Sequence, residues 1–237
     1  MGHTVEKFAL RRGHEVVARI DKDNQQDFDS EAFRSADVAI EFSVGSCAPG
    51  NILNCLERGI PVVSGTTGWL NDETRCEVAS AAAAKDVSLI MSANFSVGVN
   101  ITKALNRMLA RIMNRFPAYR AEVEEIHHTA KIDHPSGTAI ALAEEIIDHT
   151  DRYDRWAETE RGSAPQAGTV DIRYSREGDN PGYHRVSWTG DVDRIAIEHQ
   201  AFSRDGFAEG AVVAAEWITA QPKGQLYDMQ DMLKNLF

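Results

Sequence analysis

The chain has 237 residues, of which 43% are hydrophobic and 26% are charged, and these proportions are typical of a globular protein rather than a disordered or fibrous one. Its formal net charge of −11 argues against nucleic acid as a partner, because neutralising a phosphate backbone needs a clustered basic surface. The sequence holds neither an apolar run of roughly 18 residues nor an N-terminal signal core, so we expect no membrane partner.

The first part of the chain alternates helices with short apolar strands. A helix over residues 1–12 precedes a predicted buried strand over residues 15–20, and further strands are predicted at residues 35–44, 61–64 and 87–91. This alternation predicts a parallel sheet with crossover helices, in which ligands bind beyond the carboxyl ends of the strands. The residues that follow those ends are Asp21, Phe42–Ser43, Gly65–Thr67 and Ala93–Phe95.

The second part has the pattern of an α+β domain. A long amphipathic helix is predicted over residues 100–116, a strand over residues 121–128, and a second helix from about Thr138 to His149. Alternating strands are then predicted at residues 168–176, 183–190 and 193–202. We interpret the turn-rich residues 177–182 as a hairpin connection, so the sheet is expected to be largely antiparallel. A helix and a short amphipathic tail follow.

The segment EIHHTAKIDHPSGTA, Glu125–Ala139, concentrates side chains that could perform chemistry. His127 and His128 are adjacent on a predicted strand, so their side chains point to opposite faces and cannot easily bind one metal together. An ordinary packing or surface role is the alternative for each histidine. His134 with either of them would form a metal pair, which implies a metal-assisted hydrolase, but no well-placed ligand completes that pair.

The same segment contains a candidate anion site. Ser136 is a candidate N-cap, and the amides of Ser136, Gly137 and Thr138 lie at the positive end of the helix dipole. Gly137 would let a ligand approach the backbone closely. Together with the cation of Lys131 and an imidazole that donates a proton near neutral pH, this favours protonation of a small acidic substrate. The alternative is that Ser136, Gly137 and Thr138 form an ordinary helix cap and bind no anion.

The three cysteines, Cys47, Cys55 and Cys76, are an odd number without CxxC spacing. We therefore expect reduced thiols in a cytoplasmic protein and no zinc site built on them. Elsewhere, Asp21 lies where an acidic residue accepts hydrogen bonds from an adenosine ribose, and Lys22 beside it would tolerate a 2′-phosphate. Arg204, in the segment HQAFSRDGFAEGA, could bind a substrate carboxylate through two hydrogen bonds or be only a surface charge.

Glu125–Ala139 resembles the signature E-x-H-H-x-x-K-x-D-x-P-S-G-T-A of the bacterial dihydrodipicolinate reductase family, with every defining position filled. The blocks VVSGTTGW, SANFSVGVN, GDNPGYHRVSW and IEHQAFSRDGFAEGAVVAAEWI also resemble the family's, in the same order. The resemblance implies reduction of 4-hydroxy-tetrahydrodipicolinate to tetrahydrodipicolinate with NADH or NADPH, in diaminopimelate and lysine biosynthesis. It further implies a cytoplasmic homotetramer with a small dicarboxylate substrate and no metal.

The resemblance also assigns residues to roles. His127 matches the catalytic acid/base, and Lys131 matches the proton-donating lysine. His128 matches a substrate-binding residue, and Gly137 and Thr138 match the backbone cradle for a substrate carboxylate. Asp21 matches the acidic ribose ligand, Gly65, Thr66 and Thr67 match the loop at the nicotinamide side, and Ser92, Ala93, Asn94 and Phe95 match the segment that closes over the cofactor. Beside these matches, we expect Ser136 and Arg204 to bind substrate and Met1 and Lys22 to bind the cofactor. The implied domains are a Rossmann-like dinucleotide-binding domain, residues 1–98 and 208–237, and a substrate-binding and oligomerisation domain, residues 99–207.

The sequence departs from the family pattern at its N-terminus. The family begins with a strand and a Gly-rich turn that ends in Met-Gly, and here only Met1–Gly2 correspond to it. A chain without that strand and turn is expected to fold poorly and to bind NAD(P)H weakly. The alternatives are a truncated sequence of a longer chain, or a degenerate NAD(P)-binding protein without catalytic activity.

Overall fold

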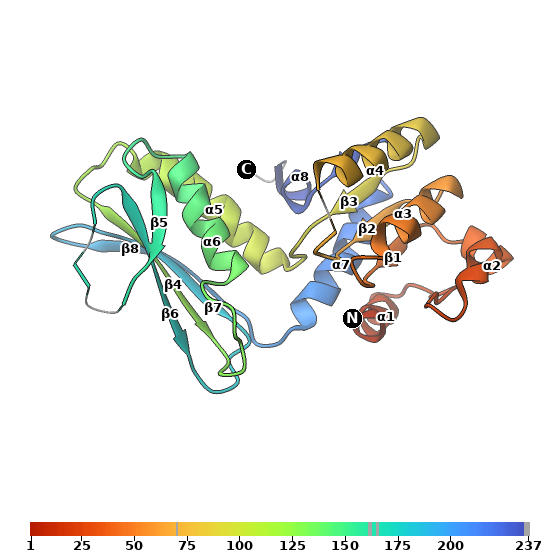
Figure 1. Cartoon of the computed structure of the whole chain (residues 1–237), viewed down its shortest axis with the longest axis horizontal. Coiled ribbons are helices and arrows are strands. Elements are labelled where there is room, and N and C mark those ends of the chain that lie inside the picture. Colours follow the sequence, from red (N-terminus) through yellow and green to blue (C-terminus); the bar gives the residue numbers. More distant parts are fainter. Residues whose placement is uncertain (70, 161–162, 165, 235–237) are drawn as a thin grey trace. The chain divides into compact units, whose positions relative to one another are not determined.

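The computed structural model of the chain describes residues 1–69, 71–160, 163–164 and 166–234. The chain divides into two units: unit 1 comprises Met1–Val97 with Asp205–Phe237, and unit 2 comprises Gly98–Arg204 (Figure 1). Among the described helices, none is long and apolar enough to cross a membrane.

Unit 1 is built on a four-stranded parallel sheet in the order β1-β2-β3-β9. Its strands are Ala39–Glu41 (β1), Val62–Ser64 (β2), Leu89–Met91 (β3) and Leu226–Tyr227 (β9). Successive strand residues point to opposite faces, so Val62 packs with one hydrophobic cluster and Val63 with another. The predicted parallel sheet with crossover helices is confirmed.

Helices cover both faces of this sheet (Figure 1). They are Gly2–Arg11 (α1), Glu31–Arg34 (α2), Ala48–Glu57 (α3), Asp72–Lys85 (α4), Asp205–Ile218 (α7) and Met229–Leu233 (α8), with a 3₁₀ helix at Gln25–Asp29. Helices α3 and α4 pack in the cluster that contains Val62 and Leu89. Helix α7 packs in the cluster that contains Val63 and Ile90, and α1 packs against α7.

The predicted strand over residues 15–20 is wrong. None of the described strands pairs with this segment, and its residues alternate between exposed and half-buried. Ala18 and Ile20 do pack against the cluster beneath α3 and α4, which accounts for the apolar pattern. A strand needs a neighbouring backbone for its hydrogen bonds, and that neighbour cannot be inferred from periodicity. Asp21 therefore does not follow a strand in this structure.

Unit 2 contains a five-stranded sheet in the order β5-β6-β4-β7-β8. Its strands are Arg120–His127 (β4), Arg155–Glu158 (β5), Thr169–Arg176 (β6), Tyr183–Thr189 (β7) and Arg194–Gln200 (β8). Strand β7 is antiparallel to β4 and β8, whereas β6 is parallel to β4 and β5. The predicted α+β architecture is confirmed. The hairpin at residues 177–182 is wrong, because β4 lies between β6 and β7 and this segment joins strands that are not neighbours.

Two helices, Val97–Met113 (α5) and Gly137–Asp148 (α6), pack with the sheet of unit 2. Strand β4 is buried at every second residue, from Ala121 through Val123 and Glu125 to His127. Helix α5 packs through small and polar residues, including Asn106 and Ala110. Most of the apolar residues that predicted this helix are instead exposed, namely Ile101, Leu105, Met108, Ile112 and Phe116.

Candidate active site

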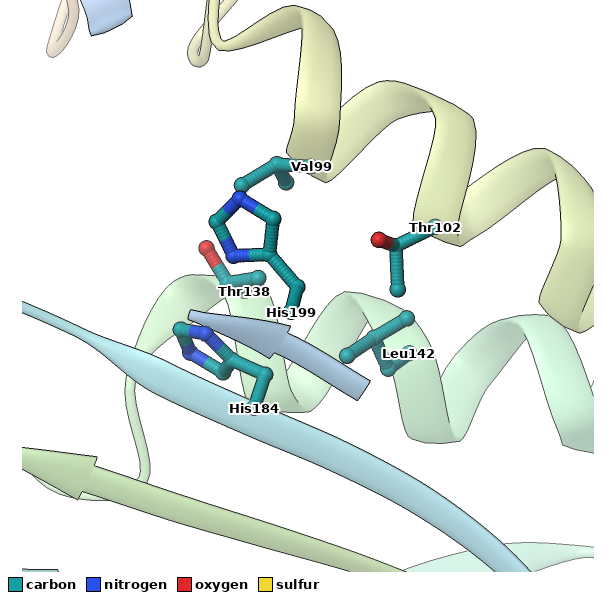
Figure 2. Close-up of a pocket in the computed structure, with 6 residues that line it drawn as sticks. All are labelled: Val99, Thr102, Thr138, Leu142, His184 and His199. Carbon is teal, nitrogen blue, oxygen red and sulfur yellow. The ribbon is translucent and has the colours of Figure 1, made fainter. Parts of the chain in front are cut away.

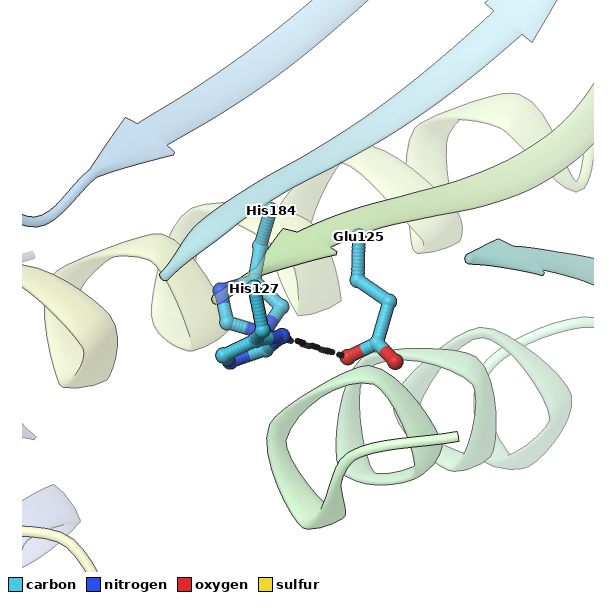
Figure 3. A group of neighbouring side chains, drawn as sticks. All are labelled: Glu125, His127 and His184. Carbon is cyan, nitrogen blue, oxygen red and sulfur yellow. Dashed lines mark ion pairs between the residues drawn. The ribbon is translucent and has the colours of Figure 1, made fainter. Parts of the chain in front are cut away.

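A carboxylate and two imidazoles meet at the buried end of β4. Glu125 and His127 are two residues apart on the strand and therefore share its buried face. His184 of β7 pairs directly with Glu125 across the antiparallel ladder, so its side chain lies on the same face. The nitrogen and oxygen atoms that these residues offer lie within 4.8 Å of one another (Figure 3).

Glu125 is the centre of this group and is fully buried, with 0% of its surface exposed. Its Oε2 atom lies 3.3 Å from Nδ1 of His127 and 3.8 Å from Nε2 of His184. The two imidazole rings meet edge to face, with 5.1 Å between their centroids. The carboxylate thus contacts both rings from one side.

Two further groups hold the carboxylate. The Ser136 amide donates to Oε1 at 3.1 Å and to Oε2 at 3.2 Å, and Nη2 of Arg176 on β6 lies 3.4 Å from Oε1. Burial raises the pKa of Glu125, but contacts with His127 and Ser136 outweigh burial and bring that pKa to about 2. Glu125 is therefore ionised throughout the neutral range.

His184 is in the opposite situation. Burial lowers the pKa of His184 to about 3, and the neighbouring His127 acts in the same direction. Its Nε2 atom lies 3.2 Å from the Ser136 hydroxyl oxygen. His184 is therefore a neutral imidazole near neutral pH.

The N-terminus of α6 lies beside this group. Ser136 is the N-cap, and its hydroxyl accepts a hydrogen bond from the Ala139 amide at 3.2 Å. The amides of Gly137 and Thr138 open the helix, so they have no carbonyl within it to bind. A Cβ atom at Gly137 would meet nothing within 4 Å, so there is free space beside the first residue of the helix. The arrangement suits a carboxylate or another small anion.

A small hollow adjoins the helix N-terminus, and Figure 2 shows the rings of His184 and His199 beside Thr138. Its lining comes from α5, α6, β7 and β8 and consists of Val99, Thr102, Thr138, Leu142, His184 and His199. Burial also lowers the pKa of His199. Both histidines therefore present neutral rings to this hollow.

The other residues that the sequence predicted to bind or protonate substrate are Lys131, His128 and Arg204. Nζ of Lys131 lies 2.6 Å from Oδ2 of Asp133, and the Lys131 side chain is only 19% exposed. His128 is half-buried just past the end of β4. Arg204 is exposed, and no hydrogen bond or ion pair joins its guanidinium to any residue that the structure describes at this site.

The predicted alternative of a metal pair with His134 is not supported. Nδ1 of His134 lies 2.7 Å from Oε2 of Glu158, and its ring stacks on Tyr174 with 4.4 Å between centroids. Glu125, His127 and His184 do have the spacing of a metal site. However, the Arg176 guanidinium contacts the same carboxylate, and a positive charge there opposes a cation. An acid–base network explains these contacts better.

Three members of the network were not singled out from the sequence. Glu125 lies inside the quoted motif, and its spacing of two residues from His127 on a strand is a signal that could have identified it. His184 and Arg176 come from other strands of the sheet. No local pattern connects them to the motif, so only the strand pairing reveals them.

In unit 1, the carboxyl ends of β1 and β2 are joined through Glu41, a buried residue at the end of β1. Its carboxylate accepts hydrogen bonds from the hydroxyls of Ser64 at 2.7 Å and Thr66 at 3.0 Å, and a third from Ser43. The Thr66 hydroxyl in turn accepts from the Ser43 amide at 2.8 Å. The loop that contains Gly65–Thr67 is therefore held against the end of β1.

Close packing fixes the other residues at the carboxyl edge of the unit 1 sheet. A Cβ atom at Gly65 would lie 2.1 Å from the Phe42 ring, so only glycine fits there. The Ser92 amide donates to the Ser64 carbonyl at 3.2 Å, which places the loop with Ala93 and Asn94 beside the loop after β2. Phe95 is 1% exposed and packs against Phe42, so only its backbone remains for a ligand. Half-buried polar loops at the carboxyl edge of a parallel sheet fit a nucleotide.

The predicted ribose and phosphate residues are at the surface of unit 1. Asp21 and Lys22 are exposed, and the Asp21 carboxylate accepts a hydrogen bond from the Lys22 amide at 2.7 Å. Met1 is the N-cap of α1, whose first turn contains no acidic residue. A helix N-terminus whose first turn holds no acidic residue is compatible with a phosphate group.

Two family models together match almost the whole chain. The model of the dihydrodipicolinate reductase N-terminus matches residues 1–95, and that of the dihydrodipicolinate reductase C-terminus matches residues 98–233. The chain is 40% identical over 237 residues to a 4-hydroxy-tetrahydrodipicolinate reductase from Christiangramia forsetii, covering 100% of this chain and 95% of the relative. It is 38% identical over 209 residues to an enzyme of the same name from Chromobacterium violaceum, covering 85% of this chain and 75% of the relative.

Solved structures show the same fold. A dipicolinate-bound dihydrodipicolinate reductase from Paenisporosarcina sp. TG-14 aligns with a TM-score of 0.78 at 21% identity, covering 100% of this chain and 95% of that one. An amine dehydrogenase from Mycobacterium smegmatis aligns with a TM-score of 0.57 at 11% identity, covering 95% of this chain and 91% of that one. At these identities the likeness concerns the fold alone.

Proposed function

The chain belongs to the dihydrodipicolinate reductase family, and we propose on this premise that it reduces 4-hydroxy-tetrahydrodipicolinate to tetrahydrodipicolinate in diaminopimelate and lysine biosynthesis. The reaction consumes one hydride and one proton, and the 4-hydroxyl group leaves as water. When bound, NADH or NADPH supplies the hydride. The observation that carries the proposal is the pairing of a buried carboxylate–imidazole group with an open helix N-terminus in the family's signature segment.

His127 is the proposed acid/base for the proton. Its side chain is 11% exposed, and Glu125 contacts its Nδ1 atom, so Nε2 is the nitrogen left to exchange a proton with substrate. Lys131 is proposed as the second proton donor and as a positive charge for the substrate dianion. Its ion pair with Asp133 must loosen for this role, because a paired ammonium is partly neutralised.

The substrate is a small dicarboxylate, and we propose that one carboxylate binds at the start of α6. The amides of Gly137 and Thr138 supply donors there, and Ser136 supplies the cap that orients them. His128 is proposed as a further substrate ligand. Arg204, which is exposed, is proposed to bind the second carboxylate.

Residues 1–98 and 208–237, most of which belong to unit 1, are proposed as the dinucleotide-binding domain, and residues 99–207 as the substrate-binding and oligomerisation domain. The loops Gly65–Thr67 and Ser92–Phe95 would hold the nicotinamide side of the cofactor. Asp21 and Lys22 would bind the adenosine ribose, and the N-terminus of α1 at Met1 would face the phosphates. Both NADH and NADPH fit this set, because Asp21 favours a free 2′-hydroxyl and Lys22 a 2′-phosphate.

A cytoplasmic homotetramer is proposed as the working form. The exposed apolar residues of α5 support self-association: Met108 and Ile112 are 46% and 50% exposed and lie at helical spacing, and Phe116, just after the helix, is 51% exposed. Contiguous apolar surface of this kind marks protein–protein contacts.

The proposal is tested by following NADH and NADPH oxidation with freshly generated substrate. We expect His127→Gln and Lys131→Met each to lower kcat by about 10²- to 10⁴-fold, because each removes a proton donor. The affinity for NADPH, measured by calorimetry, should stay unchanged, because neither residue belongs to unit 1. Near-wild-type turnover in both variants would overturn these roles, and absence of turnover in the wild-type chain would overturn the function.

A further inference from the structure

We propose that Glu125 is a positioning residue of the reaction: it fixes the proton of the His127 ring on Nδ1 and joins that ring to the helix N-terminus that receives substrate. The inference rests on the proposed acid/base role of His127. Glu125 itself is fully buried and does not need to touch the substrate.

The carboxylate of Glu125 is a charge in the interior of unit 2. A buried carboxylate is unfavourable unless donors compensate it. Here the Ser136 amide before α6 donates to the carboxylate, and the Arg176 guanidinium on β6 pairs with it. The rings of His127 on β4 and His184 on β7 lie 3.3 Å and 3.8 Å from the same carboxylate. Groups from four separate segments therefore surround the carboxylate, which indicates that it organises the site rather than merely filling space.

The neighbouring carboxylate of Glu125 selects the tautomer of His127. An ionised carboxylate only accepts hydrogen bonds, so the ring nitrogen that faces it carries the proton. Nδ1 lies 3.3 Å from Oε2 of Glu125 and makes no hydrogen bond of standard geometry to the described residues. Such contacts are often long before substrate binds and shorten in the complex. The neutral ring therefore presents the lone pair of Nε2, and the protonated ring presents an acidic N–H there.

The Nε2 atom of His127 lies beside Gly182. A Cβ atom at position 182 would lie 3.3 Å from Nε2 of His127, and Gly182 has a φ of +152°. A glycine at this position keeps the edge of the ring clear of a side chain. The contact with Glu125 uses Nδ1 of His127, so Nε2 is the ring nitrogen left for the substrate.

Ser136 connects the proposed acid, His127, to the proposed carboxylate site at the start of α6. The Ser136 amide donates to Glu125, and the Ser136 hydroxyl both caps α6 and contacts His184. One buried carboxylate therefore holds the proton donor and the first residue of the anion site in a single network. A change at Glu125 should affect the protonation step and substrate binding together.

The test is Glu125→Gln, which keeps the size of the side chain and removes its charge. His127 acts as an acid only while protonated, so activity is present at low pH and is lost as the pH rises. Loss of the negative charge, with Arg176 left unpaired, disfavours the imidazolium form. The alkaline limb of the kcat profile should therefore move to lower pH by about one to two units. The kcat at neutral pH should fall about ten- to a hundredfold.

The matched control is Glu122→Gln. Glu122 is on the same strand and pairs with an arginine, Arg173, at 2.6 Å, but its side chain points to the other face of β4. We expect an unchanged pH profile in this control. Glu125→Asp, which keeps the charge, should restore the position of the alkaline limb but not the full kcat. NADPH affinity should be unchanged in all three variants.

The proposal is overturned if Glu125→Gln keeps the wild-type alkaline limb, whatever its kcat. It is also overturned if nitrogen NMR of the wild-type chain shows the neutral His127 ring protonated on Nε2, a measurement that does not depend on how the variant folds. Near-wild-type activity of His127→Gln would instead refute the proposed function itself. The two failures are therefore distinguishable.

Discussion

The buried, neutral state of His184 predicts a specific loss of stability in mild acid. Its pKa is lowered by burial to about 3 in the folded chain, against 6.5 for the free side chain. A histidine with a depressed folded pKa contributes its full stability above the unfolded pKa, and this contribution is lost as the pH falls below it. At about pH 5 the unfolded ring binds a proton that the folded ring excludes, which costs about 2 kcal/mol of the free energy of unfolding.

The assay compares urea unfolding of the wild-type chain and His184→Gln at about pH 7.5 and about pH 5. The variant is expected to be less stable at both values, because it replaces a packed ring, but its additional loss in acid should be about 2 kcal/mol smaller. Tryptophan fluorescence reports the transition, and the fully buried Trp188 contributes to it from the same unit as His184. Equal pH dependence in the two proteins would refute the reasoning, since His184 would then not be held neutral.

Further predictions concern the helix cap, the cofactor edge and metal. Ser136→Ala removes both the cap of α6 and the contact with His184. The free energy of unfolding should therefore fall by about 1 kcal/mol, and KM for the substrate should rise. An unchanged KM would argue against an anion site at the start of α6. Glu41→Gln disturbs the three hydroxyl contacts at the ends of β1 and β2, so the Kd for NADPH should rise about tenfold or more in calorimetry. The exposed Glu77→Gln on α4 is its control and should bind as the wild type does. Turnover should survive dialysis against EDTA, because Arg176 opposes a cation beside Glu125, and a loss that zinc restores would contradict this assignment.

Local sequence patterns were sufficient to predict much of the fold and the helix N-terminus at the candidate active site. Helix α6 begins at the predicted Ser-Gly-Thr step, because a capping hydroxyl and free first-turn amides depend on neighbouring residues only. The apolar runs at Val62–Ser64 and Leu89–Met91 form strands as predicted. The segment at residues 15–20 has a similar pattern but forms no strand, because pairing requires a partner backbone.

Helix α5 illustrates the limit of periodicity. Its apolar spacing predicted an amphipathic helix, and the helix is present. Periodicity does not say which surface each face will meet. In this chain Asn106 and Ala110 face the core, and Ile112 and Phe116 remain exposed. Asn106 can be buried because its side-chain amide donates to the Leu142 carbonyl at 2.9 Å, a contact between two helices that the sequence does not reveal.

The sequence by itself determined the family, the presence of two structural units and the segment Glu125–Ala139 as the place to look for chemistry, because that signature is contiguous and depends on local spacing. Only the tertiary structure decided the partners of that segment. Strand pairing places His184 opposite Glu125, and the insertion of β4 between β6 and β7 brings Arg176 to the same carboxylate. These contacts join residues that lie far apart along the chain, so the fold and not the local sequence sets the surroundings of Glu125 and His127.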